Sequence, residues 1–151
     1  MSKRGYFGIG CFEPKHDTNI GSLWRHAYVY EADFIFTIGE RYKKQPSDTS
    51  NAPKHIPLYN YKDLADFFAH VPDDCTVIPI EQHKTHILLP YFTHPERAVY
   101  LLGSEDHGLP EEIFKDYLPL EIPTPQRISM NVATAGTIVM YDRYTKELTS
   151  A

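Results

Sequence analysis

Two polar segments of the sequence carry residue types that could bind a charged group. Asn19, Gly21 and Arg25 form the pattern N-x-G-x-x-x-R, and residues 103–109 read G-S-E-D-H-G-L. Because Gly21 lies one helical turn before Arg25, the guanidinium is free on that side to hold a phosphate or carboxylate with two parallel hydrogen bonds. The glycines of the second segment permit a tight turn around Glu105. Taken singly, the segments also fit a solvated surface arginine and an ordinary strand-to-helix turn.

A third segment, residues 122–140, joins an apolar run to a helix through a stiff loop. Pro123 and Pro125 fix the backbone and cannot continue a sheet. Ser129 is a good N-cap, and small and apolar residues follow it at helical spacing, namely Val132, Ala135, Gly136, Val139 and Met140. We therefore expect a helix that starts at Ser129 and presents backbone N–H groups to a ligand.

The periodicity of the chain predicts an α/β fold with a mostly parallel sheet and helices on both faces. Strands are expected at residues 6–12, 34–38, 76–80, 98–102 and 118–122, with a brief extended piece at 56–58. Helices are expected at residues 19–30, 62–68, 111–116 and 129–144. Residues 39–55 are predicted to be a long loop, and residues 83–95 a loop with one helical turn. The three polar segments each follow a strand, so they should meet at the carboxyl edge of the sheet, where such folds bind ligands.

The composition indicates one domain over residues 1–151 in a reducing compartment. Cys11 and Cys75 are too few for a disulfide framework or a zinc pattern. No apolar run approaches the about 20 residues of a membrane span, and the start M-S-K-R-G lacks a signal-peptide core, so we expect a cytoplasmic protein.

The charge distribution leaves nucleic acid open as a partner. A net charge of −5 argues mildly against it, because phosphate neutralisation favours a basic surface. Basic residues nevertheless gather in the first third of the chain, at Lys3, Arg4, Arg25, Arg41, Lys43, Lys44 and Lys54. A basic patch on an acidic body is therefore compatible with the sequence.

Together the three polar segments resemble the motifs of the SpoU (TrmH-type) RNA ribose methyltransferases, a branch of the SPOUT superfamily. The family's three motifs are matched by Asn19, Gly21 and Arg25, by Gly103, Glu105, Gly108 and Leu109, and by Ile122, Pro123, Ser129, Asn131, Val132 and Ala133. The resemblance covers nearly the whole chain, including Ser47, Asp48 and Thr49. The stretch between Pro123 and Ser129 is one residue shorter than usual and lacks a common glycine. We expect no additional RNA-binding domain.

The resemblance implies an enzyme that transfers a methyl group from S-adenosyl-L-methionine to a ribose 2′-hydroxyl of RNA. Transfer RNA is the first expected substrate and ribosomal RNA the second. A C-terminal trefoil knot, and a homodimer with the active site at or near its interface, are also implied. The cofactor pocket would comprise Leu101, Leu102, Gly103, Gly108, Ile122, Pro123, Ser129, Met130, Asn131 and Ala133.

The catalytic residues that the resemblance implies are Arg25, Asn19, Glu105, Ser129 and Asn131. Arg25 would grip an RNA phosphate and orient the ribose, since a free guanidinium stays protonated at neutral pH and is a poor base. Ser129 and Asn131 would position the hydroxyl or the cofactor. Glu105 and Asn19 would hold Arg25 and the loops in place. The last helix carries small residues that would permit close packing in a dimer, namely Ala133, Ala135 and Gly136.

Nucleotide-binding proteins of other kinds fit the sequence less well. Gly8 and Gly10 suggest a dinucleotide-binding strand, but Glu13 occupies the third glycine position and no helix opens there. The phosphate-loop pattern G-x-x-x-x-G-K-[ST] is absent.

Triad and metal chemistry are also disfavoured. Ser104, Asp106 and His107 are too close in sequence to form a triad, and the pattern G-x-S-x-G is absent. His83 and His86 lack the carboxylate or cysteine spacing of a metal site, so no metal is expected. A protein of another class stays open: a flavodoxin-like module, or a SpoU-fold protein that binds RNA or cofactor without turnover.

Overall fold

The computed structural model describes residues 5–39 and 52–150, which form an α/β fold around a seven-stranded sheet. The strands are β1 (Tyr6–Phe12), β2 (Phe34–Ile38), β3 (Leu58–Tyr61), β4 (Thr76–Ile80), β5 (Ile87–Leu88), β6 (Arg97–Leu102) and β7 (Leu120–Glu121). The α-helices are α1 (Asp17–Val29), α2 (Ala52–His55), α3 (Leu64–His70) and α4 (Val132–Thr149), and η1 (Leu89–Tyr91) and η2 (Glu111–Lys115) are 3₁₀-helices. The strand order is β3-β2-β1-β6-β4-β7-β5, and every pair is parallel, as predicted.

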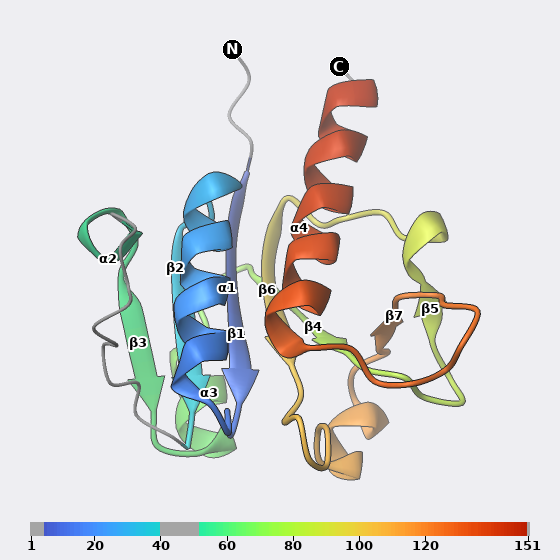
Figure 1. Cartoon of the computed structure of the whole chain (residues 1–151), viewed down its shortest axis with the longest axis horizontal. Coiled ribbons are helices and arrows are strands. Elements are labelled where there is room, and N and C mark those ends of the chain that lie inside the picture. The colour runs from blue at the N-terminus through green and yellow to red at the C-terminus, as the bar shows by residue number, and fades with distance from the viewer. Residues whose placement is uncertain (1–4, 40–51, 151) are drawn as a thin grey trace.

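Two apolar cores cover the two faces of the sheet. Alternate residues of a strand point to opposite faces, so Ile9 and Tyr100 join one core while Val99 and Leu101 join the other. Helices α1 and α4 contact each other and lie side by side on the first face (Figure 1). On the second face Phe67 of α3 packs into the core. The central strands are buried on both faces, and this explains why their sequences are continuous apolar runs.

Gly8 and Gly10 of β1 make room for aromatic rings rather than for a dinucleotide. A Cβ atom at Gly8 would lie 2.2 Å from Cζ of Phe34, and one at Gly10 would lie 2.4 Å from Cγ of Phe36. Both residues belong to the neighbouring strand β2, and their atoms occupy the space that a Cβ atom would need at these positions. The glycine pattern is therefore a packing requirement of the sheet.

Most predicted elements are present, with shifted ends. The predicted strands at 6–12, 34–38 and 76–80 match β1, β2 and β4, whereas β6 starts one residue before the predicted strand at 98–102. The strand expected at 118–122 is reduced to β7, the extended piece at 56–58 lies at 58–61, and the helices expected at 19–30, 62–68 and 111–116 correspond to α1, α3 and η2. Strand β5 and helix η1 lie within the predicted loop 83–95.

The prediction that the last helix spans 129–144 was wrong at both ends. Asn131 is the N-cap, because its Oδ1 accepts the Thr134 N–H at 3.1 Å; Ser129 lies two residues earlier, outside the helix. The helix continues to Thr149.

The predicted loop 39–55 lies largely outside the described residues. Within its described part, Ala52–His55 form α2. Residues 47–49 and the basic residues Lys3, Arg4, Arg41, Lys43 and Lys44 also lie outside the described ranges, so the predicted basic patch stays a prediction.

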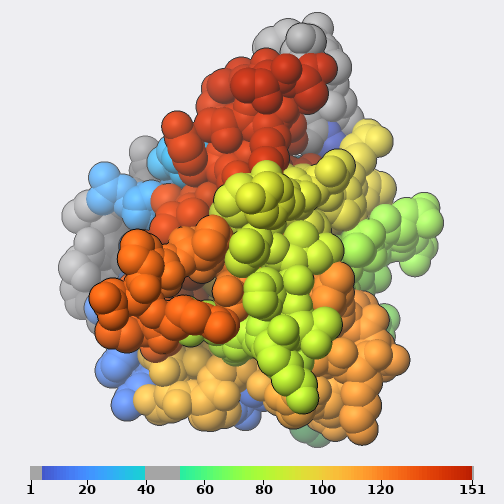
Figure 2. Space-filling model, turned by 90° about the vertical axis from the view of Figure 1, so that its right-hand side faces the viewer, coloured from blue at the N-terminus to red at the C-terminus, as the bar shows by residue number. Residues whose placement is uncertain are grey.

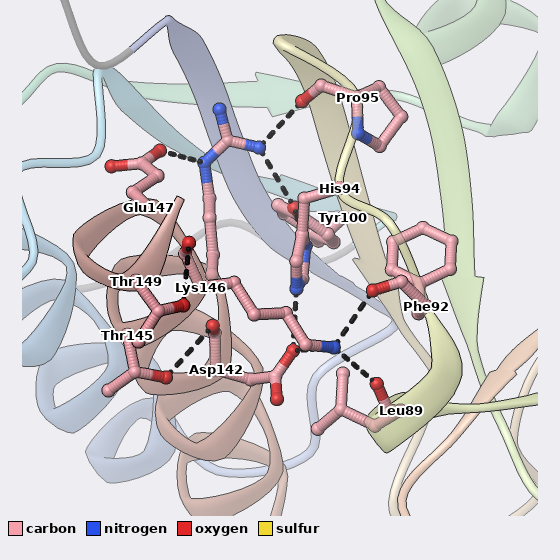
Figure 3. Close-up of polar contacts among 11 residues, drawn as sticks. Leu89, Phe92, His94, Pro95, Tyr100, Asp142, Thr145, Lys146, Glu147 and Thr149 are labelled. Atoms are coloured by element: carbon pink, nitrogen blue, oxygen red, sulfur yellow. Dashed lines mark hydrogen bonds and ion pairs between the residues drawn. The ribbon is translucent and has the colours of Figure 1, made fainter. Parts of the chain in front are cut away.

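Two basic side chains anchor the C-terminal half of α4 to the chain segment between β5 and β6 (Figure 3). Arg143 is 3% exposed, and its guanidinium donates to the carbonyl oxygens of Pro95 and Glu96 at 2.8 and 3.0 Å. The Lys146 Nζ atom donates to the carbonyl oxygens of Leu89 and Phe92 at 2.6 and 2.8 Å. These bonds tie the last turns of α4 to backbone carbonyls of this segment, which explains why the helix persists beyond residue 144.

A buried histidine lies at the centre of the same network. The His94 Nδ1 atom is 2.6 Å from the Tyr100 hydroxyl, and Nε2 is 2.7 Å from Asp142 Oδ2. A neutral imidazole satisfies both contacts: Nε2–H donates to the carboxylate, and Tyr100 donates to Nδ1 while accepting from Arg143 at 3.1 Å. Burial raises the pKa of Tyr100 to about 12, so its hydroxyl stays a donor.

Acidification should destabilise the fold through His94. Burial holds the pKa of His94 below its usual value, against the opposing effect of Asp142. Below about pH 6.5 the unfolded histidine binds a proton more readily than the folded one, so the free energy of unfolding should fall as the pH drops from about 7.5 to about 5.5. Urea denaturation at both pH values measures this. His94→Gln should show a smaller loss than wild type, whereas the exposed control His70→Gln should not; an identical loss in wild type and His94→Gln would contradict the assignment.

Candidate active site

A pocket lies at the carboxyl edge of the sheet, where β4, β6 and β7 end and α4 begins. It is lined by Ile80, Glu81, Gln82, Leu102, Gly103, Ser104, Glu105, Ile122, Ser129, Met130, Val132 and Ala135. The segment before α4 (orange) and the segment after β4 (yellow-green) lie side by side on this face (Figure 2), and Gln82 Nε2 reaches the Ile128 carbonyl at 3.5 Å. This is the edge at which open parallel sheets bind ligands.

The pocket is mostly apolar with an acidic margin. Leu102, Ile122 and Val132 supply apolar walls, and Glu81 and Glu105 supply carboxylates. Its volume is about 90 Å³, below the about 300 Å³ at the lower end of small-molecule sites. A ligand as large as a nucleoside must therefore extend into solvent or displace part of the loop at residues 123–131.

The turn at residues 103–109 forms one wall of the pocket. Its closing pair is Ser104 and Gly108, which exchange backbone hydrogen bonds of 3.2 and 2.9 Å. Gly108 has a φ of +67°, and a Cβ atom there would lie 2.3 Å from Glu81 Oε2. Glycine is required at this position for two reasons. The left-handed backbone region disfavours other residues, and the Glu81 carboxylate leaves no space for a Cβ atom.

One residue from each of the three polar segments meets beside the pocket. Asn131 Nδ2 donates to Asn19 Oδ1 at 2.8 Å, and Asn19 Nδ2 donates to Glu105 Oε1. The Asn131 side chain simultaneously caps α4. The second carboxylate oxygen, Glu105 Oε2, is buried and has no hydrogen-bond partner within the described chain. A chain of side-chain hydrogen bonds thus joins segments that are about a hundred residues apart, and it ends at an unsatisfied acceptor.

Five of the ten predicted cofactor residues line the pocket, and five do not. The lining residues are Leu102, Gly103, Ile122, Ser129 and Met130. Leu101 points into the core on the opposite face, and Ala133 is on the side of α4 that packs into the first core. Gly108, Pro123 and Asn131 are not among the residues that line the pocket.

Arg25 is separated from the other predicted catalytic residues within the chain. It is exposed on α1, and among the described residues its side chain makes no hydrogen bond or ion pair. Asn19 and Glu105 contact each other rather than Arg25. The predicted support of Arg25 by these two residues is therefore not found in the single chain.

Sequence reasoning missed Glu81 and Gln82. Both line the pocket and directly follow β4. Their position after a predicted parallel strand was the available signal, since the carboxyl ends of all such strands share one edge. Residues 76–82 contain no polar pattern that would have identified Glu81 and Gln82 as site residues.

The chain belongs to the SpoU rRNA methylase family. The family model matches residues 7–141, from β1 into α4, and so includes all three polar segments. The predicted activity class, an RNA methyltransferase that depends on S-adenosyl-L-methionine, is thereby confirmed. The comparison with curated protein sequences gave no significant match.

Solved structures share this fold at low sequence identity. One, described in a study of 2-OH methylation of C/U34 on tRNA, is 23% identical with a TM-score of 0.81 and covers 99% of this chain and 100% of its own. The SpoU methyltransferase AviRb from Streptomyces viridochromogenes, in complex with AdoMet, is 18% identical with a TM-score of 0.84; the match covers 98% of this chain and 60% of AviRb. The TrmH/SpoU tRNA modifying enzyme of A. aeolicus is 14% identical with a TM-score of 0.84, over 98% of this chain and 78% of that enzyme.

Substitutions of Asn131 should separate its two roles, which are to cap α4 and to donate a hydrogen bond to Asn19. Asn131→Ala removes the cap and the bond to Asn19, and should lower the free energy of unfolding by about 1–2 kcal/mol. Asn131→Asp keeps the capping oxygen and loses only the donor to Asn19, so it should cost less. Chemical denaturation measures both, with Ser129→Ala as the matched control. A larger cost for Ser129→Ala than for Asn131→Ala would contradict the cap assignment.

Proposed function

We propose that this chain methylates a ribose 2′-hydroxyl of RNA, with tRNA the first candidate substrate, and that the pocket beside Glu105 holds S-adenosyl-L-methionine. The observation that carries the proposal is the hydrogen-bonded chain from Asn131 through Asn19 to Glu105, which brings the three family motifs together at the pocket margin. The protein described with 2-OH methylation of tRNA supports tRNA as the substrate, and the rRNA description of the family makes rRNA the second candidate.

The residues of the pocket fit this cofactor. When bound, the cofactor supplies a methyl group on a positively charged sulfonium sulfur. Leu102, Ile122 and Met130 offer apolar surface to the adenosyl group, and Gly103 and Ser129 offer backbone groups. Two carboxylates at the margin suit a cationic ligand. Because the contact across the opening, from Gln82 to the Ile128 carbonyl, is 3.5 Å long, it gives little resistance when the loop moves to enlarge the pocket.

Arg25 would act on the RNA from a second copy of the chain. It is exposed on α1 and lies outside the pocket of its own chain. The exposed apolar residues Tyr28 and Val29 of α1 and Tyr141 of α4 are 40%, 63% and 56% exposed and favour a homodimer that packs these helices together. In such a dimer Arg25 would hold an RNA phosphate over the partner's pocket and fix the ribose hydroxyl near the methyl group. Positioning of this kind supplies several kcal/mol of the barrier.

The family's trefoil knot is part of the same proposal. Strand β7 lies between β4 and β5, two strands that precede it in the chain, and this order supports the proposed knot. Gln82 Nε2 lies 3.5 Å from the Ile128 carbonyl oxygen, so the segment after β7 lies beside the segment after β4. A cytoplasmic location stays a prediction; none of the described helices is both long and apolar enough to span a bilayer.

A transfer assay tests the proposed reaction directly. The protein should move radiolabelled methyl groups from S-adenosyl-L-methionine to bulk tRNA, and nuclease digestion should recover the label as 2′-O-methylnucleosides. Label on rRNA alone would overturn the tRNA assignment. Label on neither RNA, with intact cofactor binding, would favour the alternative of a binding protein without turnover.

Mixing two inactive variants should restore activity if Arg25 acts across the dimer. Arg25→Ala should lower kcat by about 10²-fold with cofactor affinity unchanged, because it removes a positioning contact. Ala135→Phe should block the pocket that Ala135 lines. Refolded together in equal amounts, the two variants should recover about a quarter of wild-type activity, since half of the dimers carry one intact composite site. An inactive mixture would contradict action across the dimer, and a fully active Arg25→Ala protein would contradict the role of Arg25 itself.

A further inference from the structure

Glu81 holds a position in the pocket that neither the family motifs nor the predicted site includes. It follows β4 directly, at the level where Ile80 pairs with Leu102 of the neighbouring strand β6. Its backbone N–H donates to the Leu120 carbonyl at 3.1 Å, so its place is fixed between β6 and β7. The side chain is half-buried and lines the pocket.

The Glu81 carboxylate lies directly against the turn that carries Glu105. Oε2 accepts the Leu109 N–H at 3.0 Å, and Oε1 accepts the Gln82 N–H at 3.2 Å. A Cβ atom at Gly103 would be 2.9 Å from Oε2, and one at Gly108 would be 2.3 Å from it. The two glycines therefore leave space for this carboxylate, and hydrogen bonds to neutral backbone groups leave its negative charge uncompensated.

The charges of the pocket have one sign. Glu81 and Glu105 are its two ionisable lining residues, and among the described residues neither forms an ion pair. Two basic side chains that flank the pocket contact carboxylates outside it: Arg127 pairs with Glu121 at 2.6 Å, and His83 Nε2 lies 2.8 Å from Glu111 Oε1. The charge of a paired cation is balanced by its own partner, so the electrostatic potential in the pocket stays negative.

From this geometry we infer that Glu81 is a specificity-determining residue, whose charge makes the pocket prefer the sulfonium form of the cofactor to its uncharged thioether product. Loss of the methyl group converts a positively charged sulfur into a neutral one while the rest of the molecule stays the same. A fixed carboxylate at the pocket wall attracts the first form more than the second. The product, S-adenosylhomocysteine, is then released more easily than the substrate. The inference rests on the placement of the cofactor in this pocket, proposed above.

A purely structural role of Glu81 would affect ligand binding differently from a role of its negative charge. If Glu81 served only to hold the turn at residues 103–109, its loss would weaken both ligands equally. Glu81→Gln keeps an oxygen that can accept the Leu109 N–H and removes the charge. Glu81→Ala removes both and shows what loss of the brace contributes.

Calorimetric binding of the two ligands tests the inference without any turnover. Titrations of wild type and Glu81→Gln with S-adenosylmethionine and with S-adenosylhomocysteine give the ratio of the two dissociation constants for each protein. Glu81→Gln should weaken S-adenosylmethionine about tenfold, as expected for loss of one partly hydrated charge, and change S-adenosylhomocysteine by less than about twofold. In the wild-type protein, the preference for S-adenosylmethionine over S-adenosylhomocysteine should also shrink as the salt concentration is raised, because ions screen the carboxylate.

Glu112→Gln is the matched control, because it removes an exposed carboxylate outside the pocket. It should leave the ratio unchanged, and thermal melts should report all variants as folded. An unchanged ratio in Glu81→Gln, whether both affinities fall together or neither moves, overturns the inference and leaves the proposed function standing. A wild-type protein that binds neither ligand overturns both.

Discussion

The hydrogen-bonded chain Asn131–Asn19–Glu105 is the constraint on which the site depends. Each residue begins or supports a different segment: Asn19 lies in the first turn of α1, Glu105 in the turn after β6, and Asn131 at the cap of α4. Since the parallel strands end at one edge, the backbone brings the segments near one another, and the side chains then fix their spacing. The unpartnered oxygen Glu105 Oε2 leaves one acceptor of this chain for a donor from outside it.

Elements away from the pocket keep this edge in place. The glycines of β1 leave room for Phe34 and Phe36 of β2, so the two strands pack closely along the part of β1 that precedes α1. At the other end of α4, Arg143 and Lys146 tie the helix to the segment between β5 and β6. Both ends of α4 are thus held by side chains, and the less restrained loop before it is the part that can adapt to a ligand.

The sequence predicted the architecture well and the details of the site only in part. Long apolar runs such as β1 and β4 were found with their ends, because burial on both faces leaves a continuous pattern. The two-residue strands β5 and β7 have too few residues to show a period, and the cap at Asn131 could not be distinguished from Ser129 by residue type alone. Leu102 and Leu101 are neighbours with the same chemistry, and the strand pleat decides which one faces the pocket. The proposed position of Arg25 over the pocket of a second copy involves a contact between chains, and such a contact leaves no pattern within one sequence.

The central claim is that a cofactor pocket at the carboxyl edge of one chain faces an arginine from another. A crystal structure of the protein with S-adenosylhomocysteine tests it most directly. The account predicts ligand density between the turn at residues 103–109, Ile122 and Met130, with Arg25 of the second copy directed toward the opening. Ligand bound elsewhere, or an assembly in which every Arg25 lies on the far side from the pockets, would contradict it.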